Sequence, residues 1–296
     1  MTNHPATVAD NSADIMRDLR TPPAVSWPAV VLMVMANTAI IVASALCFLE
    51  ILPLWAGTVI NALSIYLLFT PAHDSMHRSA SSNGKLNELI MAASTFVAIP
   101  FGTGKFMRVM HMRHHRFTNE ENDPDHFLSS HFLLMPVWGF WPFLYLYTFA
   151  KSPKDFPGIN ARETWREVAI GLGTVALLFV IAPVQMLWLW LIPIYVGFFL
   201  MCLVFMVLPH YPAIVRESED PYQATLIRLG WEWLLTPLLA YQNYHLVHHL
   251  YPTVPFYRYG KAWKARLAYH QSKNPGVVSP FGLGAKRTPA STKPAP

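Results

Sequence analysis

Residues 168–215 read VAIGLGTVALLFVIAPVQMLWLWLIPIYVGFFLMCLVFMVLPHYPAIV and contain no Lys, Arg, Asp or Glu at 48 consecutive positions. A helix needs about 20 apolar residues to cross a hydrocarbon core of about 30 Å, so this stretch has room for two crossings. An earlier stretch, Thr21–Pro71, has Glu50 as its only charged residue. Charged residues make up 13% of the 296-residue chain, about half the share of a soluble protein. We therefore predict an integral membrane protein with four helical spans.

The apolar stretches divide into spans at turn-forming residues. We expect the spans at about 25–49, 51–70, 168–184 and 186–208. Two weaker apolar runs, which Pro, Gly and charged residues interrupt or flank, are interpreted as helices that lie at the membrane interface. These runs are Leu86–Phe101 and the aromatic-rich Phe132–Phe149.

The distribution of Lys and Arg predicts the orientation. Both turns between paired spans, around Glu50–Pro53 and Pro183–Gln185, lack Lys and Arg. All 22 basic residues lie in the N-terminal segment, in Arg78–Arg166, or from Arg216 onward. The positive-inside rule places these three regions, and both termini, in the cytoplasm, so a bacterial inner membrane is expected. The net charge of +5 is then explained by contact with anionic headgroups, and no nucleic-acid partner is needed.

The expected fold is an all-α membrane protein in which four transmembrane helices form two hairpins under a cytoplasmic helical cap. The expected organisation is a cytoplasmic N-terminal tail (1–24), a membrane domain (25–272) and a disordered C-terminal tail (273–296), because the last segment is rich in Pro, Gly, Ser and Lys. The first 23 residues do not resemble a cleaved signal peptide. Cys47 and Cys202 lie within the apolar stretches and are expected to pack in the core.

The chain contains 13 histidines, most of them in three short motifs. The motifs are HDSMH (73–77), HMRHH (111–115) and HLVHH (245–249), and His210 stands alone in LPHYP (208–212). On a helix, residues at i, i+3 and i+4 share a face. Adjacent histidines diverge by about 100°, so His114 and His115, like His248 and His249, can address two different metal ions. This branching favours a dinuclear site over a mononuclear one.

The spans deliver these motifs to one depth. His73 follows the second expected span by three residues and His210 follows the fourth by two, which places both within about 5 Å of the same membrane boundary. The other two motifs lie in segments predicted on that same side. Imidazole suits zinc, copper, iron and nickel alike, so the ligand type leaves the metal open. A closed structural zinc site takes only four ligands, fewer than the motifs supply.

In their order around two apolar hairpins, the three motifs resemble the histidine boxes of the membrane fatty-acid-desaturase superfamily, over roughly residues 60–265. Within it, the chain is most similar to the cyanobacterial-type β-carotene hydroxylases. The similar stretches are HDSMHRSASSNGKLNEL (73–89), HMRHHRFTNEENDPDHF (111–127), LPHYP (208–212) and QNYHLVHHLYPTVPFYRY (242–259). The sequence departs from the pattern of those hydroxylases at Arg78, Met206 and Tyr211, which bears on the substrate more than on the metal site.

This resemblance implies an O₂-dependent oxidoreductase with two iron ions in its cap, which receives electrons from a ferredoxin-like protein. The implied iron ligands are His73, His77, His111, His114, His115, His210, His245, His248 and His249. The implied substrate is lipid-like and reaches the site from the membrane lipids. Of the two candidate reactions, hydroxylation of a β-carotene-type ring ranks first and oxidation of a fatty acyl chain ranks second. A metal transporter or sensor is a remote alternative. Transporters place ionisable residues at mid-membrane, whereas the expected spans contain no charged residue and no histidine.

Several residues near the motifs are candidates for supporting roles. Asp74 is expected either to orient a ligand imidazole or to neutralise Arg78, and Asn243 to hold a metal-bound water. Asp123 and Asp125 are expected to brace the second box or to form a solvated turn. Four aromatic residues line a substrate entrance or form a headgroup-level belt: Tyr251, Phe256, Tyr257 and Tyr259. Six basic residues dock an electron carrier or reflect topology alone: Arg108, Arg113, Arg116, Lys261, Lys264 and Arg266. The remaining histidines, His4, His126, His131 and His270, are not expected to bind metal.

Overall fold

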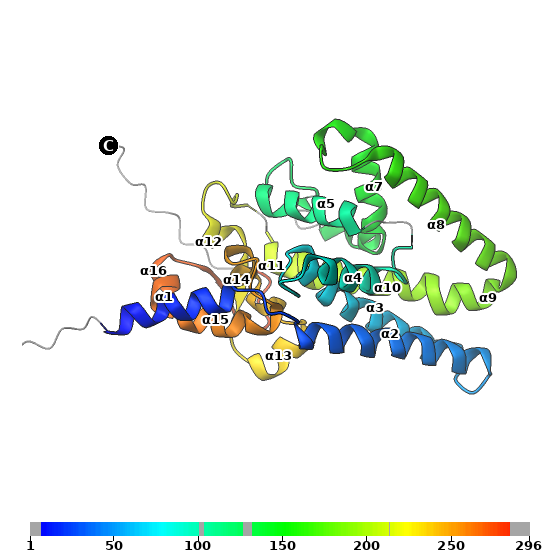
Figure 1. Ribbon diagram of the computed structural model, residues 1–296, viewed down its shortest axis with the longest axis horizontal. Helices are drawn as coiled ribbons and strands as arrows, with labels where there is room; N and C mark the ends of the chain where they lie inside the picture. Colours follow the sequence, from blue (N-terminus) through cyan, green and yellow to red (C-terminus); the bar gives the residue numbers. More distant parts are fainter. Residues whose placement is uncertain (1–6, 101–103, 127–131, 213, 285–296) are drawn as a thin grey trace, which may run out of the picture.

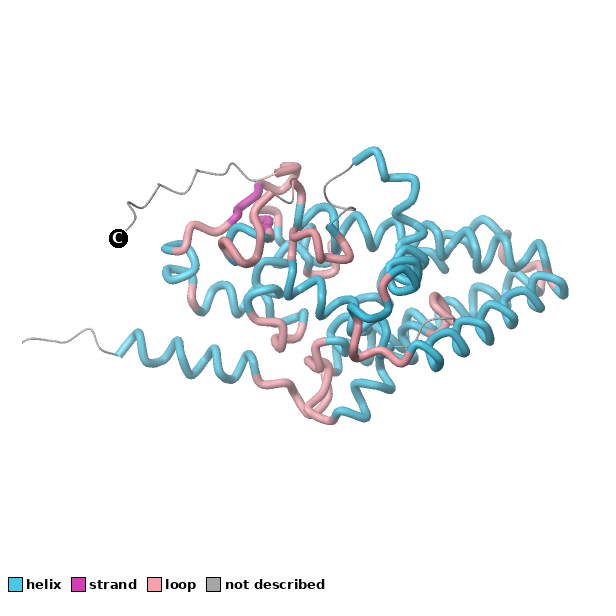
Figure 2. The backbone as a smooth tube through the Cα atoms, turned by 90° about the horizontal axis from the view of Figure 1, so that it is seen from above, coloured by secondary structure: helices cyan, strands magenta, loops and turns pink. Residues whose placement is uncertain are grey.

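The computed structural model describes residues 7–100, 104–126, 132–212 and 214–284 and is largely helical. Long helices extend toward one end of the molecule, where the turns between α2 and α3 and between α8 and α9 lie (Figure 1). Shorter helices, among them α1, α14, α15 and α16, gather at the opposite end, and the same division is visible in the orthogonal view of Figure 2.

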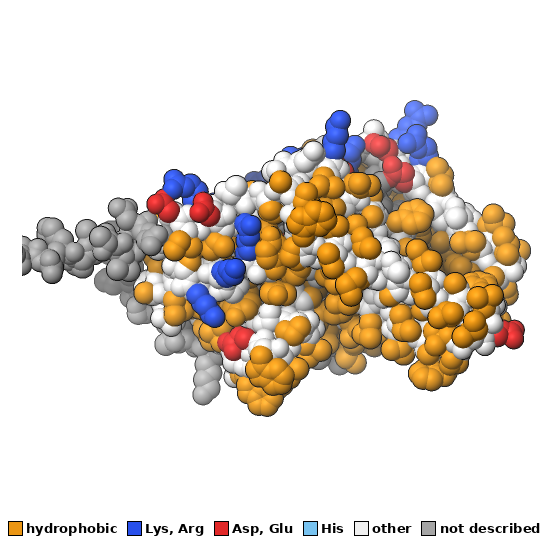
Figure 3. Space-filling model, turned by 60° about the horizontal axis from the view of Figure 1, so that its bottom comes forward, with side chains coloured by type: hydrophobic (Ala, Val, Ile, Leu, Met, Phe, Trp, Pro, Cys, Tyr) orange, Lys and Arg blue, Asp and Glu red, His pale blue; other side chains and the backbone are white. Residues whose placement is uncertain are grey.

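Four helices are long and apolar enough to cross a membrane, as the sequence predicts. They are α2 (Trp27–Phe48), α3 (Leu54–Met76), α8 (Ala161–Ile181) and a composite helix over Pro183–His210. Hydrophobic side chains cover much of the face shown in Figure 3, and the Lys and Arg side chains on that face lie along its upper edge and in its left-hand part. Ile41 on α2 and Val180 on α8, for example, are 67% and 81% exposed. Such a surface is stable only against lipid, so the protein is a membrane protein.

The span boundaries differ from several of the predicted ones. The second span, expected at 51–70, runs over Leu54–Met76 and so includes His73, which was expected to follow it. The third span begins at Ala161 rather than near residue 168, because the Asn160 side chain caps the helix by accepting a hydrogen bond from the Glu163 amide at 3.2 Å. The predicted turn at Pro183–Gln185 is wrong: the chain turns at Ala182, and Pro183 opens the next helix. Proline suits the first helical turn, since its missing N–H would have no partner there.

The composite fourth span combines three α-helical pieces and two π-helical turns. The α-helical pieces are α9 (Pro183–Met186), α10 (Ile192–Met201) and α11 (Leu208–His210), and the π-helical turns are η3 (Leu187–Leu191) and η4 (Cys202–Val207). Such turns disturb the regular pattern of backbone hydrogen bonds, which must be satisfied elsewhere in a membrane.

Side chains of α3 satisfy the carbonyl groups that this irregularity frees. Pro193 has no N–H to donate to the Leu189 carbonyl one turn earlier. Instead the Asn61 amide donates to that oxygen at 2.8 Å, and the Thr58 hydroxyl donates to the Trp188 carbonyl at 2.6 Å. The polar residues of α3 thus join it to the fourth span by hydrogen bonds.

Helix α3 lies at the centre of the spans and packs against α2, α4 (Gly84–Thr95) and α10. Two glycines permit the close approach. A Cβ on Gly57 would lie 2.5 Å from the Cys47 sulfur, and one on Gly197 would lie 2.7 Å from Ile65. Small residues at helix contacts are typical of membrane bundles. Cys47 and Cys202 are free and buried, as predicted.

The segment between the second and third spans contains α4, α5 (Gly104–Phe117), η1 (Phe132–Phe140), α7 (Trp141–Lys151) and η2 (Pro153–Asp155). The apolar run expected as one helix over 132–149 is divided at Trp141. Trp138, Trp141 and Tyr145 were expected at the headgroup level, but they are at most 2% exposed. They are buried because the Trp141 ring packs edge-on against Phe69 of α3 and the Tyr145 hydroxyl bonds to Asp125.

The C-terminal region forms the helices α12 (Pro221–Ala224), α13 (Glu232–Leu238), η5 (Gln242–Tyr244), α14 (His245–Leu250), η6 (Phe256–Arg258), α15 (Tyr259–Ala265) and α16 (Leu267–Ser272). It also contains a parallel strand pair, β1 (Leu226–Arg228) with β2 (Gly276–Val278), in which Leu226 pairs with Gly276. The Arg228 guanidinium donates to the carbonyls of Ser279, Pro280 and Gly282. The part of the expected C-terminal tail that is described, 273–284, therefore packs onto the domain.

Helix α1 (Thr7–Arg20) occupies much of the expected N-terminal tail and packs against α15. Met16 is buried in the same apolar cluster as Tyr259. The Arg258 guanidinium donates to the carbonyls of Asp18, Leu19 and Thr21, which lie at and just beyond the C-terminal end of α1. These contacts join the N-terminal helix to the histidine-bearing C-terminal region.

Helix α13 is an element that the sequence did not reveal. Trp233 and Leu238 are 78% and 60% exposed, and the Leu238 carbonyl accepts a hydrogen bond from Tyr66 of α3 at 3.0 Å. Because Tyr66 lies within a membrane-spanning helix, α13 lies beside the apolar part of the molecule.

We expect Asn61→Leu to lower the stability of the folded protein by about 1–2 kcal/mol, because the Leu189 carbonyl would lose its donor in an apolar environment. The measurement is the thermal unfolding of the detergent-solubilised protein. Thr174→Val is the matched control, since among the described residues the partner of the Thr174 hydroxyl is the Ile170 carbonyl of its own helix. Equal stability of the two variants would contradict this role of Asn61.

Candidate metal centre

Four separate segments bring the histidine motifs together. His73 lies in the last turn of α3, and His77 is the residue that ends that helix. The second box lies on α5 and the third forms most of α14. His210 is the last residue of the composite fourth span. The ends of two spans and two shorter helices therefore meet at one place.

The nine histidines form two groups. In each group the candidate ligand nitrogens all lie within 4.8 Å of one another. The five-histidine group contains His73, His77, His111, His115 and His248. The four-histidine group contains His114, His210, His245 and His249. Each adjacent pair, 114–115 and 248–249, contributes one histidine to the five-histidine group and the other to the four-histidine group, as expected when neighbouring side chains diverge on a helix.

In the five-histidine group the Nε2 atoms face one another. His77 Nε2 lies 2.8 Å from His111 Nε2, and His115 Nε2 lies 3.2 Å from the same atom. His248 Nε2 lies 2.9 Å from His115 Nε2. A neutral imidazole carries only one N–H, so a set of converging Nε2 atoms cannot all be satisfied by hydrogen bonds among themselves.

The four-histidine group repeats this arrangement. His245 Nε2 lies 3.0 Å from both His210 Nε2 and His249 Nε2. His245 Nδ1 donates to the Gln242 side-chain oxygen at 2.6 Å, so its Nε2 carries a lone pair that points into the group. The ring of His249 stacks on that of His115 with centroids 4.1 Å apart, so the two groups are in contact.

Burial keeps most of these imidazoles neutral. All nine except the half-buried His115 are at most 8% exposed. Burial, together with repulsion by neighbouring imidazoles, holds the pKa well below the ordinary value for His77, His111, His115, His245, His248 and His249. Because metal ions bind the neutral form, this environment prepares the histidines as ligands.

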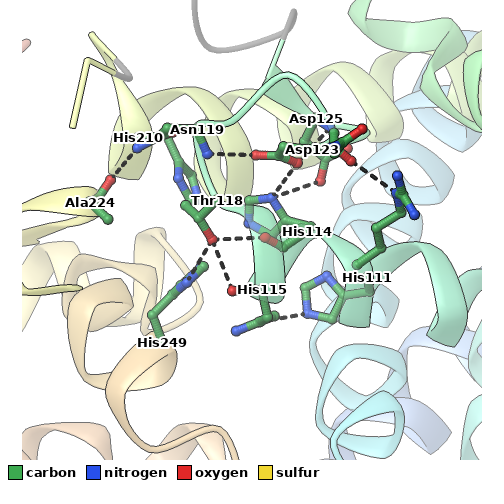
Figure 4. A network of polar contacts seen from close by, with 12 residues as sticks. His111, His114, His115, Thr118, Asn119, Asp123, Asp125, His210, Ala224 and His249 are labelled. Carbon is green, nitrogen blue, oxygen red and sulfur yellow. Dashed lines mark hydrogen bonds and ion pairs between the residues drawn. The ribbon is translucent and has the colours of Figure 1, made fainter. Parts of the chain in front are cut away.

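His114 differs because two carboxylates face its other ring nitrogen (Figure 4). Its Nδ1 lies 2.9 Å from Asp123 and 3.6 Å from Asp125. Burial lowers the pKa of His114, but the attraction of Asp123 and Asp125 outweighs it and raises the pKa to about 9. The Nδ1–H donates to Asp123, and Nε2, which points into the four-histidine group, would give up its proton when it binds a metal ion. The expected bracing of the second box by Asp123 is thus confirmed.

Other outward-facing Nδ1 atoms have partners that fix their ring orientation. His248 Nδ1 lies 2.9 Å from the Tyr259 hydroxyl, and His249 Nδ1 lies 3.5 Å from the Thr118 hydroxyl. The backbone N–H of Asn119 donates to the Asp123 carboxylate, and the Asn119 side-chain amide donates to the Ala224 carbonyl. These bonds hold the turn after α5 in place (Figure 4). Metal-binding histidines typically have such partners on the second nitrogen.

The sequence did not reveal Thr118 or Gln242 as partners, and Tyr259 was expected at a substrate entrance or in a headgroup belt. Tyr259 is 0% exposed and bonds to His248 instead. Gln242 precedes His245 by three residues, a helical spacing that is a usable signal. Thr118 and His249 are 131 positions apart, so no local pattern links them.

For the two expected supporting residues, Asp74 and Asn243, the structure shows the following contacts, and the expected role of Asn243 in holding a metal-bound water stays a prediction. Asp74 is buried, and its carboxylate accepts hydrogen bonds from the Phe256 amide at 3.2 and 3.3 Å. It therefore anchors the segment after the third box, and among the described residues neither an imidazole nor Arg78 is its ion-pair partner. Asn243 is buried and donates to the Thr236 hydroxyl at 3.2 Å, and no contact with a box histidine is described for it.

Arg108 connects the first two boxes. Its guanidinium donates to the Ser75 and Met76 carbonyls, both at 3.1 Å, and bonds to Glu88 at 2.5 Å. Ser75 and Met76 are the last two residues of α3, between His73 and His77, and Arg108 lies three residues before His111 on α5. The expected alternatives for Arg108 were carrier docking and topology, and the structure gives it a positioning contact. His4 and His131 lie outside the described residues.

The donor set fits metal ions. Both ring nitrogens of His73, and Nδ1 of His210, are buried without a hydrogen-bond partner among the described residues. Buried unpaired polar atoms are costly unless something binds them, and converging imidazole lone pairs bind cations. The two groups are compatible with a pair of iron ions.

The spans and the histidine groups define a membrane protein with a candidate dinuclear metal centre. A family model described as fatty acid desaturase matches residues 49–276, most of the chain. The chain therefore belongs to the fatty acid desaturase family, which indicates an oxidoreductase. A search of curated proteins finds no match.

We expect Asp123→Asn to weaken metal binding by about 10–100-fold, because the ring of His114 would lose the charge that orients it. The measurement is the competition for iron between the purified protein and a chelator. Glu121→Gln is the matched control, since it makes the same charge change on the exposed part of the same turn. Equal iron retention in both variants would rule out this role of Asp123.

Proposed function

We propose that the protein is an O₂-dependent di-iron enzyme that hydroxylates or desaturates a lipid-like substrate, with ring hydroxylation of a β-carotene-type molecule as the leading reaction. The observation that carries this proposal is the division of nine imidazoles into two adjacent groups with converging Nε2 atoms. Each of the two histidine groups would hold one iron ion. Bound there, a pair of iron ions supplies the redox chemistry that reduces O₂ and oxidises an unactivated C–H bond.

The residues of the chain have three tasks in this chemistry. The imidazoles bind as neutral ligands and bring no negative charge. Asp123 and Asp125, whose oxygens lie within 4.8 Å of the ring nitrogen of His114, supply negative charge beside the four-histidine group. The partners of Nδ1 hold the rings in position. Burial of the site excludes bulk water, which limits side reactions.

A small apolar cavity marks where a substrate from the bilayer would reach the site; its volume of about 20 Å³ has room for about one water-sized group, so the substrate would have to widen it. The cavity lies between α3, the end of α4 and α10, and its lining includes Phe69, Ala98, Ile99 and Phe198. The Phe69 ring lies 5.7 Å from the ring of His73, so the cavity borders the five-histidine group. Transfer of a long apolar molecule into water would cost about 0.8 kcal/mol per CH₂, so access through the membrane is favoured.

The resemblance of HDSMHRSASSNGKLNEL and the third box to β-carotene hydroxylases supports the ring substrate, and the family supports a fatty acyl chain as the second candidate. We further propose a bacterial inner membrane as the location, with both termini and the site in the cytoplasm. The basis is the absence of Lys and Arg from the two short turns. A ferredoxin-like protein is the proposed source of electrons.

We expect expression in cells that make β-carotene to yield hydroxylated carotenoid, and the purified protein to hold about two iron ions. His115→Ala or His248→Ala should abolish the product, because each removes a ligand from the five-histidine group. Mass spectrometry and metal analysis are the measurements. Altered acyl chains with unchanged carotenoid would favour the second candidate. A single zinc ion per chain would exclude the oxygenase reaction.

We expect Ala98→Phe to reduce turnover about ten-fold or more with unchanged iron content, because its ring would fill the apolar cavity beside Phe69. Product formation per iron is the measurement. Ala92→Phe is the matched control, since Ala92 lies on α4 and is exposed. If Ala98→Phe leaves turnover unchanged, the substrate does not use this cavity.

A further inference from the structure

A cleft with a basic lining lies between α1 and the C-terminal helices. Arg17 and Arg20 of α1 and Arg266, the residue between α15 and α16, line it together with Met16 and Thr253. No Asp or Glu is among the described residues that line this cleft. The family match begins at residue 49, so α1, which supplies one wall, lies outside the matched region.

The arginines of the cleft are positioned by aromatic rings. The Arg20 guanidinium carbon lies 5.8 Å from the centroid of Tyr251, and that of Arg266 lies 4.0 Å from the centroid of Tyr269. Arg17 forms an ion pair with Asp14 on its own helix, whereas Arg20 and Arg266 form none with the described carboxylates. Two uncompensated guanidinium groups therefore face the cleft and suit a partner with carboxylates.

The cleft is close to the third histidine box. Thr253 in its wall is four residues from His249, so the two Cα atoms are at most about 14 Å apart. The intervening Tyr251 is 8% exposed, and its hydroxyl lies 3.1 Å from Nε2 of the buried His270. The His270 ring packs 4.9 Å from Trp263, one helical turn after Tyr259, which contacts His248. Closely packed groups thus fill the space between the cleft and the histidines.

The proposed reaction cannot proceed on its substrate alone. Hydroxylation of a C–H bond by O₂ yields one C–OH group and one water, and this balance requires two electrons and two protons from outside. A carrier that delivers electrons one at a time must approach the metal centre closely, and it must leave after each transfer. Electrostatic attraction gives rapid association without tight binding.

We propose that this cleft is the docking site of a small acidic one-electron carrier protein, which delivers electrons toward His248 and His249. The inference rests on the proposed di-iron function. A membrane headgroup is the competing anionic ligand. The cleft helices α1, α15 and α16 lie at the end of the molecule opposite the turns of the spans (Figure 1). That position favours a soluble partner over a lipid.

The test uses the iron-loaded, detergent-solubilised protein and a reduced [2Fe–2S] ferredoxin of acidic surface, mixed without oxygen. The rate of ferredoxin reoxidation is followed by absorbance. We expect the Arg20→Gln/Arg266→Gln double variant to lower the second-order rate constant about ten-fold at low salt, and to weaken its salt dependence. The matched control is Arg162→Gln/Arg166→Gln, which removes the same charge from exposed positions on α8. Dithionite should reduce all three proteins equally.

The outcomes separate the two hypotheses. A failure of dithionite to reduce the wild-type centre would overturn the proposed function. If dithionite reduces every protein but both double variants slow the ferredoxin reaction equally, or neither does, the docking site is overturned. Loss of binding to phosphatidylglycerol vesicles in the Arg20→Gln/Arg266→Gln protein, with an unchanged ferredoxin rate, would assign the cleft to a headgroup instead.

Discussion

The structure depends on one constraint: nine largely buried imidazoles cannot satisfy one another by hydrogen bonding. His245 directs a lone pair toward two neighbouring Nε2 atoms, and both ring nitrogens of His73 lack a partner among the described residues. Such a cluster is costly without a cation at its centre. The ends of two spans meet α5 and α14 at one place, so that this convergence is possible. The rest of the fold supports the positions of these rings.

Much of this could be predicted from the sequence, because the responsible signals are local. Charge-free stretches predicted four spans, and the HxxHH spacing predicted that His114 and His115 diverge, which the two groups confirm. Asp123, the partner of His114, was among the expected residues, but the partners that lie far away in sequence could not be predicted. Thr118 contacts His249 and Asp74 contacts Phe256 across long separations in sequence, and such pairs follow from tertiary packing alone. The aromatic residues misled for a related reason, since a buried Trp141 and a headgroup-level tryptophan look alike in sequence.

Pro183 was the other source of error, whereas Pro193 lies inside a span as expected. Pro183 was interpreted as part of a turn, but it opens a helix, and Pro193 lies within a span without ending it. Both outcomes depend on whether another group replaces the backbone N–H that proline lacks. At Pro193 the donors come from Asn61 and Thr58 on a neighbouring helix, a compensation that only the packed structure reveals. The fourth span thus reaches His210 unbroken, and the end of this helix carries a ligand candidate to the centre.

The unequal division of the histidines has a consequence for any metal pair bound there. Five imidazoles surround one position, whereas four surround the other, and one of those four is polarised by Asp123. The two ions would then be electronically distinct, with separate reduction potentials and an order in which they change valence. The difference between the two positions is a property of the protein ligands alone and does not require a bound substrate or oxidant.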